Sequence, residues 1–271
     1  MRVAVVGMGN MGQRHARVLR DLGHEVVTVD TDPARKPDYA TLPRADTACI
    51  ATPPSALFEQ AAGAIERGMD VLVEKPMALT AGQAKALGAR ARLKQRRLAV
   101  GYTERHNPVI TVLAAQLPRL GRVRHITIQR LGPAPVHPTP VWLDLATHDL
   151  DVLRFLGFAP QLLHVAGGED HLVSTYQHGR ATATIEASHL HPAKVRTISV
   201  TGTCGMLSAD YQAQTLDLFT HDSVSRLPVR QAEPLRLQWD RFPHGATARD
   251  GVAALELATE LGDRLQVRQA A

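Results

Sequence analysis

The sequence has few cysteines and no long apolar run. Cys49 and Cys204 are its only cysteines in 271 residues, and two thiols cannot form the scaffold of a disulfide-rich protein. Cys49 falls within a predicted buried strand, which fits a reducing compartment. No segment approaches the roughly 18 consecutive apolar residues of a membrane-spanning helix, and the apolar start at Val3 meets glycines too early for a signal peptide. We therefore expect a soluble, cytoplasmic protein without a membrane partner.

Aromatic residues are also scarce, at 4% of the chain, whereas the formal net charge is +5. The basic residues are mostly scattered arginines, without the dense basic clusters and interleaved aromatic side chains of a nucleic-acid surface. We therefore expect no nucleic-acid partner. A positive field raises the local concentration of phosphates, so a small anionic ligand is compatible with this composition.

A glycine motif follows the first apolar run directly. Residues 1–6 predict a short β-strand, residues 13–22 predict a helix, and Gly7, Gly9 and Gly12 lie between or at the start of them. Gly7 permits a tight turn, Gly9 allows a pyrophosphate to approach the backbone, and Gly12 allows close packing of the helix on the strand. The helix N-terminus attracts the anion. The spacing predicts a dinucleotide-binding site.

An acidic residue supports this interpretation. A second predicted strand, residues 25–29, ends at Asp30, where a carboxylate would bind a ribose 2′-hydroxyl. The alternative is a tight strand-to-helix turn followed by an incidental acid.

Strands and helices alternate at first and then give way to consecutive strands. Up to residue 102, predicted strands at 46–51, 70–73 and 98–102 alternate with predicted helices at 55–67 and 81–94. Later strands are predicted at 123–130, 161–166, 172–177, 181–188, 196–201 and 206–209, followed by a closing helix over 247–268. The first pattern predicts a parallel Rossmann sheet and the second a largely antiparallel sheet. We therefore expect an α/β protein with an N-terminal Rossmann dinucleotide-binding domain, 1–102, and a C-terminal α+β domain with an open sheet, 103–271.

Lys75 is one of only five lysines in a chain that otherwise uses arginine. It follows the predicted strand 70–73, and ligands collect at the carboxyl ends of strands in open α/β sheets. Pro76 pushes Lys75 towards an extended conformation and allows a cis peptide bond. Lys75 is therefore a candidate proton acceptor. The alternative is a lysine paired with Glu74 at the end of a strand.

A second group of titratable residues lies on the predicted helix 142–155. Asp144, His148 and Asp151 are spaced by four and three residues, so they share one helix face. A histidine oriented by a carboxylate can act as an acid or base. The alternatives are a salt bridge on a solvated face or a helix-end cap. One histidine with carboxylates is a thin metal-ligand set, and we interpret the nearby His189 and His191 as an exposed pair, so no metal is expected.

Four motifs together resemble the Gfo/Idh/MocA family of NAD(P)-dependent sugar and cyclitol oxidoreductases. They are Gly7-x-Gly9-x-x-Gly12, Ala51-Thr52-Pro53-Pro54, Glu74-Lys75-Pro76 and Asp144-x-x-x-His148. Segments 102–108, 145–151, 192–196 and 200–202 resemble one branch of it, the UDP-N-acetylglucosamine 3-dehydrogenases and related nucleotide-sugar dehydrogenases.

The resemblance implies roles for individual residues. Lys75 matches the lysine that touches the substrate hydroxyl and the nicotinamide, and Asp144 and His148 match the acid and histidine that bind and deprotonate the oxidised hydroxyl. Asp30 matches the position that selects NAD, and Thr31 beside it offers no cation for a 2′-phosphate, so NAD is favoured over NADP.

The implied binding residues form two sets. The cofactor-binding residues are Gly7, Gly9, Asn10, Met11, Gly12, Asp30, Thr52, Pro53, Glu74 and Lys75. The substrate-binding residues are Glu104, Arg105, Asn107, Lys194 and Arg196. Lys194 and Arg196 alternate onto one strand face, where they either meet a diphosphate or form an exposed basic pair. This sequence departs from the family at His106, where phenylalanine is common, and in a short segment between Asp32 and Asp46.

The expected function is the oxidation of a secondary sugar hydroxyl by hydride transfer to NAD, with C3 of a UDP-N-acetylhexosamine as the expected substrate position. Two alternatives stay open: a dehydrogenase of free sugars or inositol, and a non-catalytic NAD-sensing or sugar-sensing regulator. An open sheet with an apolar face needs covering, so we also expect a homo-oligomer, dimeric or tetrameric.

Overall fold

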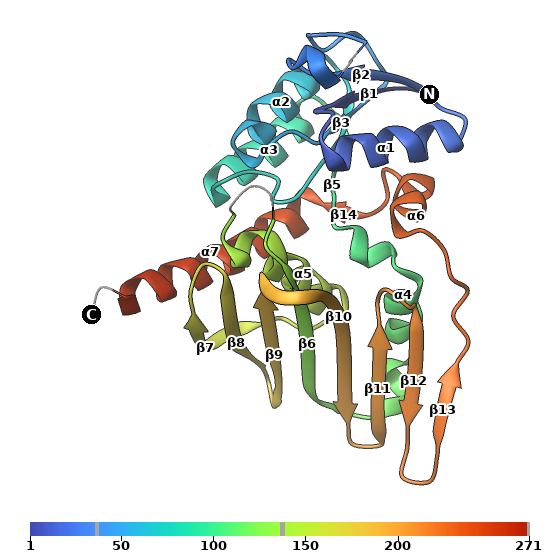
Figure 1. Ribbon diagram of the computed structural model, residues 1–271, viewed down its shortest axis with the longest axis vertical. Coiled ribbons are helices and arrows are strands. Elements are labelled where there is room, and N and C mark those ends of the chain that lie inside the picture. Colours follow the sequence, from blue (N-terminus) through green and yellow to red (C-terminus); the bar gives the residue numbers. More distant parts are fainter. Residues whose placement is uncertain (36–37, 136–138, 270–271) are drawn as a thin grey trace. The chain divides into compact units, whose positions relative to one another are not determined.

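The computed structural model describes residues 1–35, 38–135 and 139–269 (Figure 1). The chain forms two compact units. Unit 1 contains Met1–Thr103 and Glu233–Ala253, and unit 2 contains Glu104–Ala232 and the described residues from Ala254 onward.

Unit 1 is a Rossmann fold built on a six-stranded sheet. The strand order is β14-β5-β4-β3-β1-β2, and β1 to β5 pair in parallel. The strands are β1 (Arg2–Val6), β2 (Glu25–Val29), β3 (Thr47–Ile50), β4 (Asp70–Val73), β5 (Leu98–Val100) and β14 (Ala246–Thr247). The helices are α1 (Asn10–Asp21), α2 (Pro54–Glu66), α3 (Ala81–Leu93) and α6 (Pro234–Arg241), with a short 3-10 turn at Pro33–Arg35. The predicted dinucleotide-binding fold is confirmed.

Local sequence explains where the helices of unit 1 begin. Thr80 precedes α3, and its hydroxyl accepts a hydrogen bond from the Gln83 amide at 3.2 Å, as its capping pattern predicts. The helix predicted from residue 55 is α2, which begins one residue earlier, at Pro54, with Pro53 as its N-cap. Proline suits the first helical position because the N–H that it lacks would have no helical partner there.

Residues Glu233–Ala253 belong to unit 1, so a single domain boundary at residue 102 does not describe the chain. Ala246 and Thr247 of β14 pair antiparallel with Val100 and Ala99 of β5. Leu235 and Trp239 of α6 pack in the same core as residues of β1 and α1. A two-residue strand and an eight-residue helix carry too little periodicity to be recognised from sequence.

Unit 2 contains an eight-stranded sheet that one layer of helices covers. The strand order is β13-β12-β11-β10-β6-β9-β8-β7, and every neighbouring pair is antiparallel except β6 and β9. The strands are β6 (Val123–Pro133), β7 (Gln161–Gly167), β8 (His171–His178), β9 (Ala181–Ser188), β10 (Leu190–Gly202), β11 (Gly205–Asp210), β12 (Thr215–Phe219) and β13 (Val224–Leu227). The largely antiparallel sheet is confirmed, and β12 and β13 extend it beyond the predicted strands.

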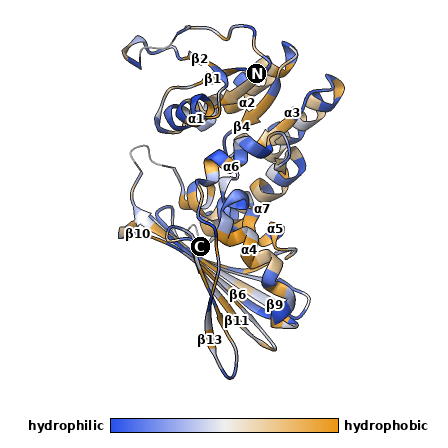
Figure 2. Ribbon diagram, turned by 90° about the vertical axis from the view of Figure 1, so that its right-hand side faces the viewer, coloured by the Kyte–Doolittle hydropathy of each residue, from blue (hydrophilic) through white to orange (hydrophobic). Residues whose placement is uncertain are grey.

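The helices of unit 2 provide the other half of its core. They are η2 (Thr103–His106, shared with the end of unit 1), α4 (Pro108–Gln116), η3 (Leu117–Leu120), η4 (Trp142–Ala146), α5 (Thr147–Phe155) and the part of α7 (Ala248–Gln269) that follows Ala253. Apolar residues of α4, α5 and α7 pack with Ile126 and Ile128 of β6 and Ile198 of β10. Figure 2 shows α4 and α5 on one side of this sheet. Among the described residues, no helix has the length and apolar character that crossing a membrane requires.

Candidate active site

The glycine turn between β1 and α1 has the geometry that its spacing predicts. Gly7 has a φ of +90°, and a Cβ there would lie 2.7 Å from the carbonyl oxygen of Ala51. A Cβ on Gly12 would overlap the carbonyl oxygen of Gly7. Gly9 differs, because a Cβ there would meet no atom of the protein within 4 Å. The turn therefore requires glycine at two positions for folding and keeps open space at the third, which fits a bound pyrophosphate.

Asp30 lies at the end of β2 as an ionised hydrogen-bond acceptor. Its Oδ2 accepts from the Met8 amide at 2.7 Å, and its Oδ1 accepts from the Asp32 amide at 2.9 Å. Arg35 donates to Oδ2 at 2.9 Å. Partial burial disfavours the charge, but the two amides and the guanidinium hold the pKa of Asp30 below its usual value. The structure thus places one cation, Arg35, where sequence reasoning found none.

A pocket of about 580 Å³ opens at the carboxyl ends of β1, β2 and β3. Its lining includes Gly7, Asp30, Arg35, Thr52, Pro53 and Arg67. The Thr52 hydroxyl is buried and has no hydrogen-bond partner among the described residues. Asn10 and Met11 form the first turn of α1, beyond Gly9. An open glycine cradle, an unsatisfied buried hydroxyl and a carboxylate at a strand end together fit the adenosine and phosphate groups of a dinucleotide.

Lys75 is the second residue after β4, at the same edge of the sheet. It is half-buried, and its peptide bond to Pro76 is cis. The Glu74 carboxylate before it is buried, with Oε1 2.8 Å from Nε2 of His15 and Oε2 accepting from the Lys75 amide at 3.2 Å. The structure therefore adds His15, from α1, to the residues of this motif.

In unit 2, the helix that carries Asp144 and His148 begins with a π-helical turn over Trp142–Ala146. Asp144 lies in this turn, and its Oδ2 is 3.1 Å from Nε2 of His189. His148 follows in α5 and is half-buried. The interpretation of His189 as exposed is wrong, because it is 7% exposed and faces Asp144.

Asp151 pairs with Arg105 and does not lie on a solvated helix face. Its two carboxylate oxygens accept from Nε and Nη2 of Arg105, each at 2.7 Å, and the acid is fully buried. This bidentate pair joins the predicted substrate loop to α5.

A buried charge cluster lies next to that pair. Arg130 of β6 donates to Asp149 at 2.8 Å and to Glu104 at 3.1 Å, and its guanidinium lies 5.4 Å from the ring centre of Tyr211. Asn107 donates to Glu104 at 3.2 Å and to the Tyr211 carbonyl at 3.1 Å. Burial raises the pKa of Asp149 to about 6, against the opposing effect of Arg130. The cluster orders the loop that holds Glu104, Arg105 and Asn107.

Sequence reasoning missed Arg130, Asp149 and Tyr211, although one signal was present. Along β6, Ile126, Ile128 and Arg130 have the same parity, so Arg130 had to share the face of two core residues. A charge on a core face needs a partner, and that requirement identifies Arg130.

Lys194 and Arg196 lie together on β10. A Cβ on Gly132 would be 3.6 Å from both the Lys194 Cγ and the Arg196 Nη2. Arg196 is opposite Arg130 in the strand register, and it donates to the carbonyls of Leu131 and Val195. Burial, and then the charge of Arg130, lower the pKa of Arg196, while Asp149, Glu104 and Asp144 oppose this effect. Arg196 is thus within electrostatic reach of Asp144 and Glu104. Within the described residues, no group of three or more His, Cys, Asp or Glu side chains is arranged to hold a metal ion.

Comparisons with known proteins agree with this fold. Residues 1–102 match the family model described as "Oxidoreductase family, NAD-binding Rossmann fold". The UDP-N-acetylglucosamine 3-dehydrogenase of Acidithiobacillus ferrooxidans is 29% identical over 58% of this chain and 54% of its own length. The myo-inositol dehydrogenase Hyg17 of Streptomyces leeuwenhoekii is 31% identical over 58% of this chain and 55% of its own length. The matched regions thus span about half the length of these curated relatives.

Solved structures match over nearly the whole chain. That of UDP-N-acetylglucosamine 3-dehydrogenase GnnA from A. ferrooxidans superposes with a TM-score of 0.87, at 22% identity and 98% coverage of each chain. That of the WlbA dehydrogenase from Bordetella pertussis, in complex with NADH and UDP-GlcNAcA, superposes with a TM-score of 0.86, at 19% identity, covering 100% of this chain and 96% of that one. Residues 1–102 thus match the model of an oxidoreductase family with an NAD-binding Rossmann fold, and nearly the whole chain shares the fold of these solved structures.

Proposed function

We propose that this protein is an NAD-dependent dehydrogenase that oxidises a secondary hydroxyl of a sugar, namely C3 of a UDP-linked N-acetylhexosamine. The observation that carries the proposal is the place of Lys75, two residues after β4 at the carboxyl edge of a sheet that also presents the glycine cradle and Asp30. The names of one relative and two solved structures, which concern UDP-sugars, support the substrate class.

The cofactor site is formed by the open glycine turn and the pocket beside it. The amides at the start of α1, near Asn10 and Met11, bind the pyrophosphate, and Asp30 accepts a hydrogen bond from a ribose hydroxyl. NAD supplies the hydride acceptor when it is bound. Thr52, Pro53 and Glu74 complete the proposed set of cofactor-binding residues.

The chain's own residues handle the proton and orient the sugar. His148 accepts the hydroxyl proton, and Asp144, whose carboxylate contacts His189, binds the same hydroxyl. The Lys75 amine donates a hydrogen bond to the oxygen that becomes the carbonyl. Lys194 and Arg196 provide cationic groups for a diphosphate, and Glu104, Arg105 and Asn107 form the loop that contacts the sugar.

A second candidate function is the oxidation of a free cyclitol. An inositol 2-dehydrogenase of Streptomyces avermitilis is 26% identical over 99% of this chain and 94% of its own length, which is a longer match than that to the UDP-sugar enzyme. The two candidates share the fold, the cofactor and the proposed proton acceptor. They differ in the need for Lys194 and Arg196, because inositol carries no diphosphate.

One assay separates these functions. Purified protein is incubated with NAD and with UDP-N-acetylglucosamine, UDP-N-acetylgalactosamine, free hexoses or inositols, and NADH formation is followed by its absorbance. Turnover of a UDP-sugar alone supports the proposal, whereas turnover of inositol alone replaces it with the second candidate. Absence of turnover across the panel, with NAD binding intact, contradicts both and favours a sensor.

A further inference from the structure

The Glu74 carboxylate packs directly against Gly101, where any larger residue would overlap it. A Cβ on Gly101 would lie 2.8 Å from the Glu74 Cδ and Oε1 and 2.9 Å from Oε2. Above this glycine, Glu74 has two hydrogen-bonding contacts, His15 Nε2 at 2.8 Å and the Lys75 amide at 3.2 Å. The carboxylate therefore links α1 to the backbone of Lys75.

The contacts of His15 fix the direction of its hydrogen bonds. Trp239 of α6 donates from Nε1 to Nδ1 of His15 at 2.9 Å, and an indole N–H can only donate. Nδ1 must therefore accept, so the ring proton is on Nε2 and is donated to Glu74. His15 is 0% exposed and Trp239 is 2% exposed, so water does not compete for either bond.

We propose that His15 and Trp239 are positioning residues for the reaction, acting through Glu74 on Lys75. This inference rests on the proposed role of Lys75. In this chain of bonds the Trp239 N–H donates to His15, His15 donates to the Glu74 carboxylate, and the Lys75 amide donates to the same carboxylate. It holds the backbone from which the Lys75 amine extends, and a small displacement of that amine reduces the rate because reacting groups must be closely aligned.

Three variants test the chain of bonds. His15→Phe removes both ring nitrogens, Trp239→Phe removes only the indole N–H, and His15→Gln keeps one donor and one acceptor. We expect His15→Phe to lower kcat by roughly 100-fold and Trp239→Phe by roughly tenfold, with the KM for NAD changed less than about threefold. His15→Gln should recover most of kcat. A purely structural role would instead lower melting temperature, NAD binding and kcat together, without recovery in His15→Gln, and would overturn the proposal.

A second measurement is independent of turnover. Hydrogen exchange of the Lys75 amide should be slow in the wild type and in His15→Gln, and faster in His15→Phe. Slow exchange in the wild type without turnover of any sugar would contradict the proposed function while leaving the positioning chain intact. Unchanged exchange in His15→Phe would contradict the positioning chain itself.

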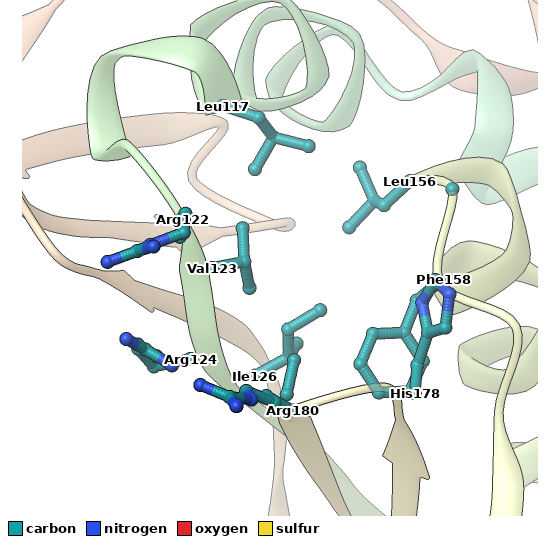
Figure 3. Close-up of a pocket in the computed structure, with 11 residues that line it drawn as sticks. Leu117, Arg122, Val123, Arg124, Ile126, Leu156, Phe158, His178 and Arg180 are labelled. Atoms are coloured by element: carbon teal, nitrogen blue, oxygen red, sulfur yellow. The ribbon is translucent and has the colours of Figure 1, made fainter.

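A separate feature of unit 2 is a pocket of about 340 Å³ at one end of its sheet (Figure 3). Its walls are apolar, with Val123 and Ile126 from β6, Leu117 from η3, and Leu156 and Phe158 after α5. None of the proposed catalytic or substrate-binding residues lines it.

Three arginines lie together on one side of this pocket. The side chains of Arg122, Arg124 and Arg180 lie opposite Leu156 and Phe158 in Figure 3. No acidic residue appears among the described residues of the lining, and none of the three arginines forms an ion pair within the described part of the chain. Arg124 lies in β6, and Arg122 and Arg180 directly precede β6 and the neighbouring β9, so their like charges repel one another and the cluster favours an anion.

We infer that this pocket binds a small amphiphilic anion, a phosphate or carboxylate attached to an apolar chain. The apolar walls accommodate the chain, and the three guanidinium groups bind the head group. The pocket provides no carboxylate to bind a cation, so the expected preference is for negatively charged ligands.

Calorimetric titration with octyl phosphate, octanoate, octanol and inorganic phosphate tests both parts of the site. We expect the two amphiphilic anions to bind, the stronger of them identifying the head group, and octanol and phosphate to bind at least tenfold more weakly. Arg122→Gln/Arg124→Gln should weaken octyl phosphate at least tenfold, and Arg119→Gln, outside the lining, should not. Equal binding of octanol and octyl phosphate, or no effect of the double substitution, would overturn the inference.

Discussion

Asp30 in unit 1 and Asp149 in unit 2 are held by different means. In unit 1, Asp30 is fixed mainly by backbone amides of its own neighbourhood, those of Met8 and Asp32. In unit 2, Asp149 is fixed by the side chain of Arg130, which comes from another element. A group held by backbone needs only a short local motif, whereas a group held by an opposite charge needs a partner at one particular place in the fold. Substitutions among the contacts of Asp30 should therefore have local effects, and substitutions in the Arg130–Asp149 pair should have effects that spread further.

The largest expected effect is on catalysis, from Lys75→Ala in unit 1. We expect turnover to fall by about 10³-fold, because loss of one hydrogen-bond donor to a reacting oxygen costs roughly 10² to 10³ in rate. NAD affinity and melting temperature should stay nearly unchanged, since the variant leaves the Glu74 carboxylate and the glycine turn in place. Steady-state kinetics and NAD titration measure both quantities, with Lys85→Ala as the matched lysine control. Retained turnover would remove Lys75 from its proposed role.

The next effect is on stability, from Arg130→Met in unit 2. The substitution leaves Asp149 buried without its cation, and breaking a buried pair in this way costs about 3 to 5 kcal/mol of unfolding free energy. Trp142 lies in unit 2, so urea unfolding followed by its fluorescence in a Trp239→Phe background reports on that unit. The double variant Arg130→Met/Asp149→Leu should recover most of the loss. An unchanged unfolding midpoint in Arg130→Met would show that the pair contributes little.

A smaller effect separates two glycines of the same turn. Gly9→Ala should weaken NAD about tenfold, or 1.4 kcal/mol, without changing stability, because its Cβ meets the cofactor and no protein atom. Gly7→Ala should lower both NAD affinity and stability, because its Cβ approaches Ala51 and its φ is positive. Isothermal titration and thermal unfolding distinguish the two. Equal stability losses in both variants would contradict the assigned roles.

The smallest effect concerns cofactor choice. Arg35 pairs with Asp30 and is 41% exposed at the side chain, so Arg35→Ala should change stability little. Its guanidinium contacts the acid proposed to bind the ribose, and its removal should lower the NADP-to-NAD affinity ratio about fivefold, as expected for an exposed ion pair. Competitive binding of the two cofactors measures the ratio, with Arg92→Ala on α3 as the control. A ratio that rises in Arg35→Ala would place the 2′-phosphate elsewhere.

The sequence was informative where structure is locally determined. The first 30 residues contain β1, the glycine turn, β2 and Asp30. The local sequence is enough to predict each of these features. Lys75 follows the same rule, because it comes two residues after a short apolar strand. The alternation of apolar and polar residues likewise predicted most strands of the second sheet.

The remainder depended on partners distant in sequence. Trp239 is 224 residues from His15, and Arg105 is 46 residues from Asp151, and nothing in either local pattern indicates the other member. Uniform α-helical spacing predicts that Asp144, His148 and Asp151 share one helix face. The π-helical turn does not follow that spacing. Sequence spacing therefore predicted the candidate residues but not which acid meets which base.

That π-helical turn, Trp142–Ala146, is equivalent to one residue inserted into an α-helix. Deleting a residue such as Leu143 would restore ordinary helical geometry and rotate the preceding part of the helix by about 100° relative to His148. The relation between the acid and the histidine thus depends on chain length as well as on residue identity. A homologue that keeps both Asp144 and His148 but lacks one residue of this turn would therefore arrange the two side chains differently.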